Sequence, residues 1–336
     1  MTKYRVLLLS IVAAFGIAAH AQEPKPIVRL EPAFDAIVPP NAKVEKIAGN
    51  LVYGLEGPLW IRKGGYLIFS GMNSNLIYKW NPKDGKVSNF LEHAGFTGSD
   101  PTGIGGETKI GNEVLYSIGP NGSTLDPQGR IVFCAQGDRQ VVRLEKDGRR
   151  TVLASHYQGK RLNSPNDLIY KKDGALYFTD PAAGLREREK DPKKELPFLG
   201  VFLLKDGKLQ KLLDNLQPNG IALDPSEKYL YVNDNASQSI MRYEVQRDDT
   251  IANGKVFVHL GIRGPGGTKV DKKGNVYCTT FDGVWVISPE GKHLGTIPFP
   301  QELANISFGD PDGKTLYAAG RTELYRIRFN IPGIHP

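Results

Sequence analysis

Three stretches of the 336-residue chain share a pattern in which an asparagine directly follows a proline, and a fourth has the same pattern with a glycine in that place. The stretches are PNGSTLDPQG (120–129), PNDLIYKKDG (165–174), PNGIALDPSE (218–227) and GPGGTKVDKKG (264–274). The residues after the proline are Asn121, Asn166, Asn219 and Gly266. Amide oxygens that converge with a carboxylate suit a hard cation such as calcium. Taken alone, each Pro-Asn stretch is also typical of a turn, so a turn role is the alternative.

Two weaker copies of the same pattern flank these four. They are LEGPLWIRKGG (55–65) and ANISFGDPDG (304–313), which place Glu56 and Asn305 in register with the asparagines. The six positions together offer one carboxylate and several amides, and neither histidine nor cysteine. Zinc and copper, which prefer nitrogen and sulfur ligands, are therefore not expected there.

The spacing of the copies indicates the fold that must position these residues. The four clearest copies start at 120, 165, 218 and 265, and each is followed by runs of alternating apolar residues separated by turn residues. About four short strands per repeat of 40–50 residues are typical of a β-propeller blade. We therefore predict an all-β, six-bladed β-propeller, in which residues 42–49 supply the outer strand of the last blade. A solenoid is the alternative, but nothing in the sequence resembles its capping repeats.

The position of the repeated residue within each blade predicts a site. The innermost strand of a propeller blade starts at one mouth of the central channel, so we expect all six positions to converge there. Residues 91–119 lengthen the first repeat and are expected to form an inserted loop that shapes a pocket rim. The charged segment 184–200 is expected to be a second, mobile rim loop.

The N-terminus and the composition limit the location and the partners. Lys3 and Arg5, a short apolar run and the sequence Ala-His-Ala at 19–21 predict a signal peptide over residues 1–21, with a membrane anchor as the less favoured alternative. We expect a single domain over residues 22–336, periplasmic or secreted, without a membrane span after cleavage. The net charge of +7 comes from scattered basic residues, so nucleic acid is not an expected partner. Cys134 and Cys278 lie in apolar runs and are expected to be buried free thiols.

Several longer motifs resemble the gluconolactonase family, which includes senescence marker protein and luciferin-regenerating enzyme. They are EGPLW (56–60), GKRLNSPNDL (159–168), ALYFTDP (175–181), PNGIALDPSEKYLYVND (218–234) and GDPDGKTLYAAGRTELYRIR (309–328). The resemblance covers nearly all of the chain after residue 21. The resemblance implies a six-bladed propeller that holds one divalent ion, often calcium. It also implies an enzyme that hydrolyses sugar lactones.

Matched by position, the family's metal-binding glutamate falls on Glu56 and one ligating asparagine falls on Asn219. Asn166 matches a residue that contacts metal or substrate, and its neighbour Asp167 is also a polar residue of the family. The last ligand of the family is an aspartate, and that position is Gly266 here. The resemblance thus implies a cation site that has lost one carboxylate.

Two interpretations of Asp282 are open. The TFDG sequence around it is typical of a hairpin turn, which is the favoured interpretation. Alternatively, because this loop follows the second strand of its blade, the carboxylate reaches the space left at Gly266 and replaces the missing ligand.

The combined prediction is a metal-dependent hydrolase of sugar lactones. The ion, most simply Ca²⁺, polarises the lactone carbonyl, and Asp167 acts as the base. Asn121, Asn166 and Arg161 are expected to bind the substrate, and Asn166 is expected to contribute to both metal binding and catalysis. Two alternatives are a catalytically impaired propeller that binds a sugar acid, because of Gly266, and a propeller that binds proteins through its two insertions.

Overall fold

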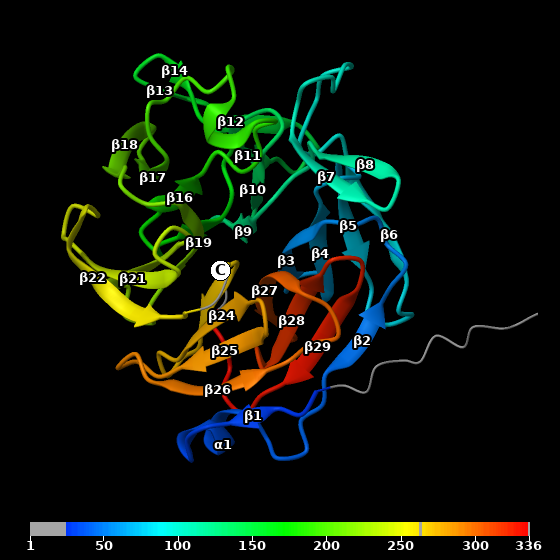
Figure 1. The fold of residues 1–336 in the computed structure, drawn as a ribbon, viewed down its shortest axis with the longest axis vertical. Coiled ribbons are helices and arrows are strands. Elements are labelled where there is room, and N and C mark those ends of the chain that lie inside the picture. The colour runs from blue at the N-terminus through cyan, green and yellow to red at the C-terminus, as the bar shows by residue number, and fades with distance from the viewer. Residues whose placement is uncertain (1–24, 262–263, 335–336) are drawn as a thin grey trace, which may run out of the picture.

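Six small antiparallel sheets surround a central channel, as the repeats predict (Figure 1). The computed structural model describes residues 25–261 and 264–334. The predicted signal peptide, residues 1–21, lies outside the described residues. No helix among the described residues is both long enough and apolar enough to cross a membrane. The fold is a six-bladed β-propeller.

Blades 1 and 2 are each four-stranded. Blade 1 contains, from the channel outward, β3 (Leu55–Ile61), β4 (Tyr66–Gly71), β5 (Leu76–Trp80) and β6 (Val87–Glu92). Blade 2 contains, in the same order, β9 (Ser123–Leu125), β10 (Ile131–Ala135), β11 (Gln140–Leu144) and β12 (Arg150–Ala154). Every residue of β10 is buried, because the second strand of a blade is covered by neighbouring blades on both faces.

Blades 3 and 4 repeat this arrangement. Blade 3 contains β15 (Leu168–Tyr170), β16 (Leu176–Asp180), β17 (Gly200–Lys205) and β18 (Lys208–Leu213). Blade 4 contains β19 (Pro218–Leu223), β20 (Tyr229–Asp234), β21 (Ser239–Val245) and β22 (Ile251–His259). A small hairpin of β13 (His156–Tyr157) and β14 (Lys160–Arg161) lies on the connection between blades 2 and 3.

Blades 5 and 6 both recruit strands from the N-terminal end of the chain. Blade 5 contains β23 (Thr268–Val270), β24 (Val276–Thr280), β25 (Gly283–Ile287), β26 (His293–Ile297) and the added β1 (Val28–Arg29). Blade 6 contains β27 (Leu303–Gly309), β28 (Thr315–Gly320), β29 (Leu324–Arg328) and β2 (Glu45–Ala48). The prediction that residues 42–49 supply the outer strand of the last blade is confirmed, because β2 pairs with β29.

The apolar core is divided among the interfaces between blades. The residues that the structure describes form six clusters of buried side chains, one between each pair of neighbouring blades. At the interface that closes the ring, Trp60 of blade 1 stacks on Tyr317 of blade 6 with ring centroids 5.5 Å apart. Outside the ring, the short helix α1 (Ala33–Ile37) buries Phe34 against blade 5. Cys134 and Cys278 are buried and unpaired, as expected.

Both insertions lie together on one rim. Residues 91–119, predicted as a loop, contain a hairpin of β7 (Gly106–Ile110) and β8 (Glu113–Ser117). Residues 184–200 contain a short 3₁₀ helix, η1 (Arg188–Lys190). The Arg186 guanidinium lies over the Tyr116 ring at 3.9 Å and donates a hydrogen bond to Ile104 O at 2.9 Å. The second insertion is thus anchored to the first.

Candidate active site at one mouth of the channel

The six repeated positions lie where the inner strands begin. They fall within the first three residues of β3, β19 and β27 or two residues before β9, β15 and β23, and these strands line the centre of the ring (Figure 1). We call this set the ring positions: Glu56, Asn121, Asn166, Asn219, Gly266 and Asn305. Four of them carry a buried polar side chain, and Asn219 is half-buried. The structure therefore brings the predicted residues to one mouth of the channel.

Hydrogen bonds between blades hold the main chain of the ring positions. In each case a polar side chain on a second strand donates to a carbonyl of the next blade. These bonds are Ser70 Oγ to Asn121 O (2.6 Å), Thr179 Oγ1 to Asn219 O (2.7 Å), Asn233 Nδ2 to Gly266 O (2.6 Å) and Thr279 Oγ1 to Ala304 O (3.1 Å). Because these bonds fix the main chain, the side chains at the ring positions are held in place before any ligand binds. Such an arrangement is typical of a preorganised site.

A close approach of neighbouring blades explains the glycine that follows several ring positions. The Gly220 N–H donates to Gly266 O at 3.1 Å, and a Cβ at Gly220 would collide with that oxygen. Blade 3 departs from this rule, because it has Asp167 where blades 1, 2, 4 and 5 have glycine. The main chain of blade 3 therefore presents an additional carboxylate at the ring.

Glu56 supplies the carboxylate of blade 1. Its side chain is buried, and its Oε2 accepts a hydrogen bond from Gly57 N at 2.7 Å. The pKa of Glu56 is raised from 4.5 to about 7, chiefly by burial and also by the nearby charge of Asp167. Hydrogen bonds from Gly57 and Asn305 oppose this rise in the pKa, as does the charge of Lys269. An added cation would stabilise the ionised form of such a carboxylate.

Asp167 lies between the ring and the interior of the channel. Its Oδ1 accepts the Leu168 N–H at 2.9 Å, and its Oδ2 accepts a hydrogen bond from Lys269 Nζ at 3.3 Å. Lys269 comes from blade 5, so this ion pair crosses the channel. Two carboxyl groups, Glu56 and Asp167, and one ammonium group thus lie close together at this end of the channel.

Asn121 has a free amide oxygen. Gln136 Nε2 donates to Ser117 O at 2.9 Å, which orients Gln136 Oε1 to accept from Asn121 Nδ2 at 2.7 Å. Within the described chain, Asn121 Oδ1 is buried and has no hydrogen-bond partner. A buried acceptor without a partner is costly unless a ligand or water satisfies it, and a hard cation is a suitable ligand.

Main-chain contacts position the asparagines of blades 3 and 4. Asn166 N donates to Thr179 O at 2.9 Å, and Asn219 O accepts from Thr179 Oγ1. Before Asn166 the chain turns around Asp180, whose carboxylate accepts the N–H groups of Asn163 and Ser164, both at 2.8 Å. Burial raises the pKa of Asp180 to about 7. Asp180 thus shapes the loop that delivers Asn166 and does not itself face the ring.

Gly266 is packed too closely for a larger residue. A Cβ at this position would collide with Thr279 Oγ1 and Ala304 O, the second of which is main chain. Next to it, Asn305 Oδ1 lies over Gly267 and accepts the Ile306 N–H at 2.8 Å. Blade 5 therefore contributes no side-chain ligand at its ring position, and the Asn305 amide fills adjacent space.

The structure does not bring Asp282 to the ring. The Asp282 side chain is exposed, and its Oδ1 accepts hydrogen bonds from Thr280 Oγ1 at 2.6 Å and Trp285 Nε1 at 3.0 Å. Trp285 stacks on His293 of the outer strand β26, so these contacts direct the carboxylate away from the channel. The proposed replacement of the ligand lost at Gly266 is wrong, and the hairpin-turn interpretation agrees with these bonds.

Arg161 lies on the rim and not within the ring. Its guanidinium donates to Asp138 O at 2.8 Å. It lines a cavity of about 80 Å³ together with Gln136, Arg186 and Lys193, beneath the two insertions. Gln136 lines this cavity and also accepts a hydrogen bond from Asn121.

The residues at the ring fit a divalent cation of the calcium type. No group of three or more His, Cys, Asp or Glu side chains is arranged for a metal anywhere in the described residues, so a carboxylate-rich site is absent from them. What the ring offers is Glu56, the free Asn121 Oδ1 and the amides of Asn166 and Asn219. Mixed carboxylate and amide oxygens suit calcium, and a low ligand charge reduces affinity.

Sequence reasoning missed Lys269 and Gln136. Lys269 is the third residue after its ring position, where other blades have Leu59, Thr124, Ile169, Ala222 and Phe308. A single charged residue among otherwise uncharged aligned residues was a signal that could have been found. The role of Gln136 depends on contacts with Asn121 and Ser117 that no spacing reveals.

Comparison with known proteins agrees with this geometry. Residues 55–320 match the family described as SMP-30/Gluconolactonase/LRE-like region. A gluconolactonase of Zymomonas mobilis is 35% identical over 322 residues, which cover 91% of this chain and 87% of that protein. A solved structure of a putative gluconolactonase is 29% identical and covers 93% of this chain and 100% of its own, with a TM-score of 0.79. A gluconolactonase from Xanthomonas campestris is also 29% identical, covers 91% and 96% respectively, and has a TM-score of 0.77.

Proposed function

The chain belongs to the SMP-30/gluconolactonase/LRE-like family, and we propose that it is a metal-dependent hydrolase of sugar lactones. The proposal rests on one observation: Glu56, Asp167 and the Asn121 Oδ1 without a partner among the described residues lie together at one mouth of the channel. A relative that is 35% identical over most of the chain is a gluconolactonase, which supports the same substrate class.

Glu56, Asn166 and Asn219 would hold the cation, with Asn121 Oδ1 as a further oxygen. Calcium is the proposed ion, since all of these are oxygen donors. When bound, the ion would polarise the lactone carbonyl and stabilise the negative charge that develops on its oxygen. The loss of a carboxylate at Gly266 predicts that the ion is held more weakly than in a site with two carboxylate ligands.

Asp167 is the proposed base. It is adjacent in sequence to Asn166, and its carboxylate is held at the axis by Lys269 and by the Leu168 N–H. Asp167 would take a proton from water as the water oxygen bonds to the carbonyl carbon. The ring C–O bond then breaks, and the released alkoxide receives the proton, giving the open hydroxy acid. Asn121 and Asn166 would orient hydroxyl groups of the substrate, with Arg161 at the outer rim.

The alternative of a propeller that only binds a sugar acid rests on Gly266 and is not favoured. Identity to a gluconolactonase extends over 91% of the chain, and the carboxylates at 56 and 167 are both present. Export to the periplasm or medium remains a prediction from the N-terminal sequence.

The test is hydrolysis of D-glucono-1,5-lactone, followed as proton release above the spontaneous rate. The protein after residue 21 is expected to accelerate the reaction with calcium present and to lose most of this activity with a chelator. Folded protein without activity on several sugar lactones, with any divalent ion, would overturn the proposal.

A further inference from the structure

Lys269 is the one charged residue in a column of six aligned residues of the inner strands. The column consists of the third residue after each ring position: Leu59, Thr124, Ile169, Ala222, Lys269 and Phe308. Lys269 belongs to blade 5, whose ring position is Gly266 and has no side chain. The blade without a side chain at the ring is therefore the blade that brings a positive charge into the channel.

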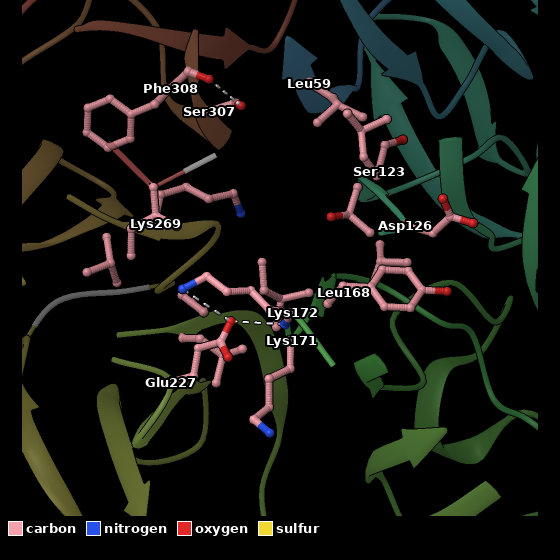
Figure 2. Close-up of a pocket in the computed structure, with 18 of the residues that line it drawn as sticks. Leu59, Ser123, Asp126, Leu168, Lys171, Lys172, Glu227, Lys269, Ser307 and Phe308 are labelled. Carbon is pink, nitrogen blue, oxygen red and sulfur yellow. Dashed lines mark hydrogen bonds and ion pairs between the residues drawn. The ribbon is translucent and has the colours of Figure 1, made fainter. Parts of the chain in front are cut away.

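The Lys269 side chain lies between the ring and a cavity at the other end of the channel. This cavity has a volume of about 300 Å³, and its lining includes Leu59, Leu168 and Phe308. Figure 2 shows the lysine side chain reaching into this space from the side opposite Ser123 and Leu168. Because the side chain is 21% exposed, packing does not enclose it on every side.

The ammonium group of Lys269 is bonded to the carboxylate of Asp167. Its Nζ donates to Asp167 Oδ2 at 3.3 Å and to Thr268 O at 3.0 Å. The Asp167 side chain is only 3% exposed, so Lys269 supplies a positive charge where water supplies little compensation. Removal of one partner from such a buried pair leaves an uncompensated charge and is usually destabilising.

The same ammonium group also acts on Glu56. Burial is the largest cause of the raised pKa of Glu56, and the charge of Asp167 adds to it, whereas the charge of Lys269 lowers this pKa. Lys269 therefore favours the ionised form of the carboxyl group that is the proposed charged ligand of the ion. One ammonium group thus serves two carboxyl groups.

A cation at the ring would meet the same two carboxyl groups. Both are buried, and the repulsion between two positive charges is stronger where little water screens it. The bond from Lys269 to Asp167 is longer than the roughly 2.7–2.9 Å of a typical charge-assisted hydrogen bond, so little is lost when it breaks. The adjoining cavity offers space for an ammonium group that moves away from Asp167.

We propose that Lys269 is the internal counter-ion of Glu56 and Asp167 in the metal-free protein and competes with the cation for them. The ammonium group holds the two carboxyl groups together, so the ring is formed before an ion binds. The same charge lowers the affinity for the ion, because it must stay beside the ion or move into the adjoining cavity. This inference rests on the proposed cation site at the ring and does not depend on the hydrolysis of a lactone.

The test is a calorimetric titration of calcium into metal-free protein at low salt. Lys269→Met is expected to bind calcium at least about tenfold more tightly than the wild type, because the competing charge is gone. Lys269→Arg keeps the charge and should restore most of the weaker binding. Lys172→Met is the matched control: it removes the same charge from the lining of the same cavity, where the lysine side chain is 81% exposed, and should leave the affinity unchanged.

Thermal unfolding separates this role from a purely structural one. In chelator, Lys269→Met should have a lower Tm than the wild type, because Asp167 has lost its partner. At one fixed calcium concentration, the ion should raise the Tm of Lys269→Met by more than it raises the Tm of the wild type, since the tighter complex is stabilised more. A lysine that only supports the fold would lower the Tm equally with and without calcium.

Two results would overturn the inference. Calcium affinity of Lys269→Met equal to or below that of the wild type would overturn it and leave the cation site itself in place. The absence of calcium binding to both proteins up to about 10 mM would overturn it together with the proposed cation site. Should Lys269→Met fail to fold, Lys269→Gln, which is uncharged but can still donate to Asp167, decides between the same outcomes.

Discussion

The two ends of the channel are built from the same six strands but differ in how their polar groups are used. At the ring, side chains such as Thr179 and Ser70 donate to main-chain oxygens of the next blade. In the cavity at the other end, whose lining includes Ser123 and Thr124, neither hydroxyl group makes such a bond within the described residues. One end is therefore fixed by hydrogen bonds between blades, whereas the buried hydroxyl groups at the other end take no part in such bonds.

Within one repeat, some residue types are therefore set by the packing of the blades, and others depart from the repeat for a different reason. Where blades touch closely, as at Gly220 and Gly266, the residue type is dictated by the lack of space. Asp167 and Lys269 break the pattern of their columns and meet each other across the channel. Departures from a repeat at positions that face the channel are thus the better indicators of chemistry.

The largest effect is expected at Asp167. Asp167→Asn keeps the size of the side chain but removes the proposed base, so kcat for lactone hydrolysis should fall by about 10²–10⁴. Calcium-dependent thermal stabilisation should survive, because the proposed ligands remain. The same rate in wild type and variant would exclude Asp167 as the base.

Glu56 should make the stability of the metal-free protein depend on pH. Since burial raises its pKa from 4.5 to about 7, the folded state binds this proton more tightly than the unfolded chain does. The resulting stabilisation is complete below pH 4.5 and is lost as the pH rises to 7. Urea unfolding in chelator should show the free energy of unfolding of wild type falling by roughly 3 kcal/mol relative to Glu56→Gln across this range. Parallel pH profiles would contradict the raised pKa.

Close packing at the ring is tested by Gly220→Ala. The new Cβ would collide with Gly266 O, so the free energy of unfolding should fall by about 1–3 kcal/mol or more. Gly49→Ala is the matched control, because the atoms nearest to its Cβ would lie at ordinary contact distance, 3.5 Å or more. Equal denaturation midpoints for the two variants would show that the blades approach less closely than described.

The smallest effect on stability is expected when a threonine is replaced by valine at each end of the channel in turn. Thr179→Val removes the hydrogen bond to Asn219 O and should cost about 1–2 kcal/mol in the free energy of unfolding. Thr124→Val loses no bond within the described chain and should change stability by less than about 0.5 kcal/mol. A larger loss for Thr124→Val would mean that its hydroxyl group has a structural partner.

Repetition made the fold predictable from the sequence. The register of Glu56 with the asparagines identified the ring, and the apolar pattern of residues 42–49 identified the strand that closes it. The hairpin β7–β8 was missed because much of it is exposed, which weakens the alternation that marks a strand. The Asp167–Lys269 pair was missed because 102 residues separate its members and only the closed ring brings them together. For Asp282, the loop was placed correctly, but the local bonds to Thr280 and Trp285 decide where the carboxylate points.

The most direct test of the ring as a metal-dependent active site is a calcium titration of chelator-treated protein during lactone hydrolysis, for the wild type and Glu56→Gln. The wild-type rate should rise and saturate with one ion per chain, whereas Glu56→Gln should need at least about 100-fold more calcium, because it lacks the carboxylate ligand. Full activity of the wild type in chelator, or the same calcium dependence in both proteins, would contradict a cation held at Glu56.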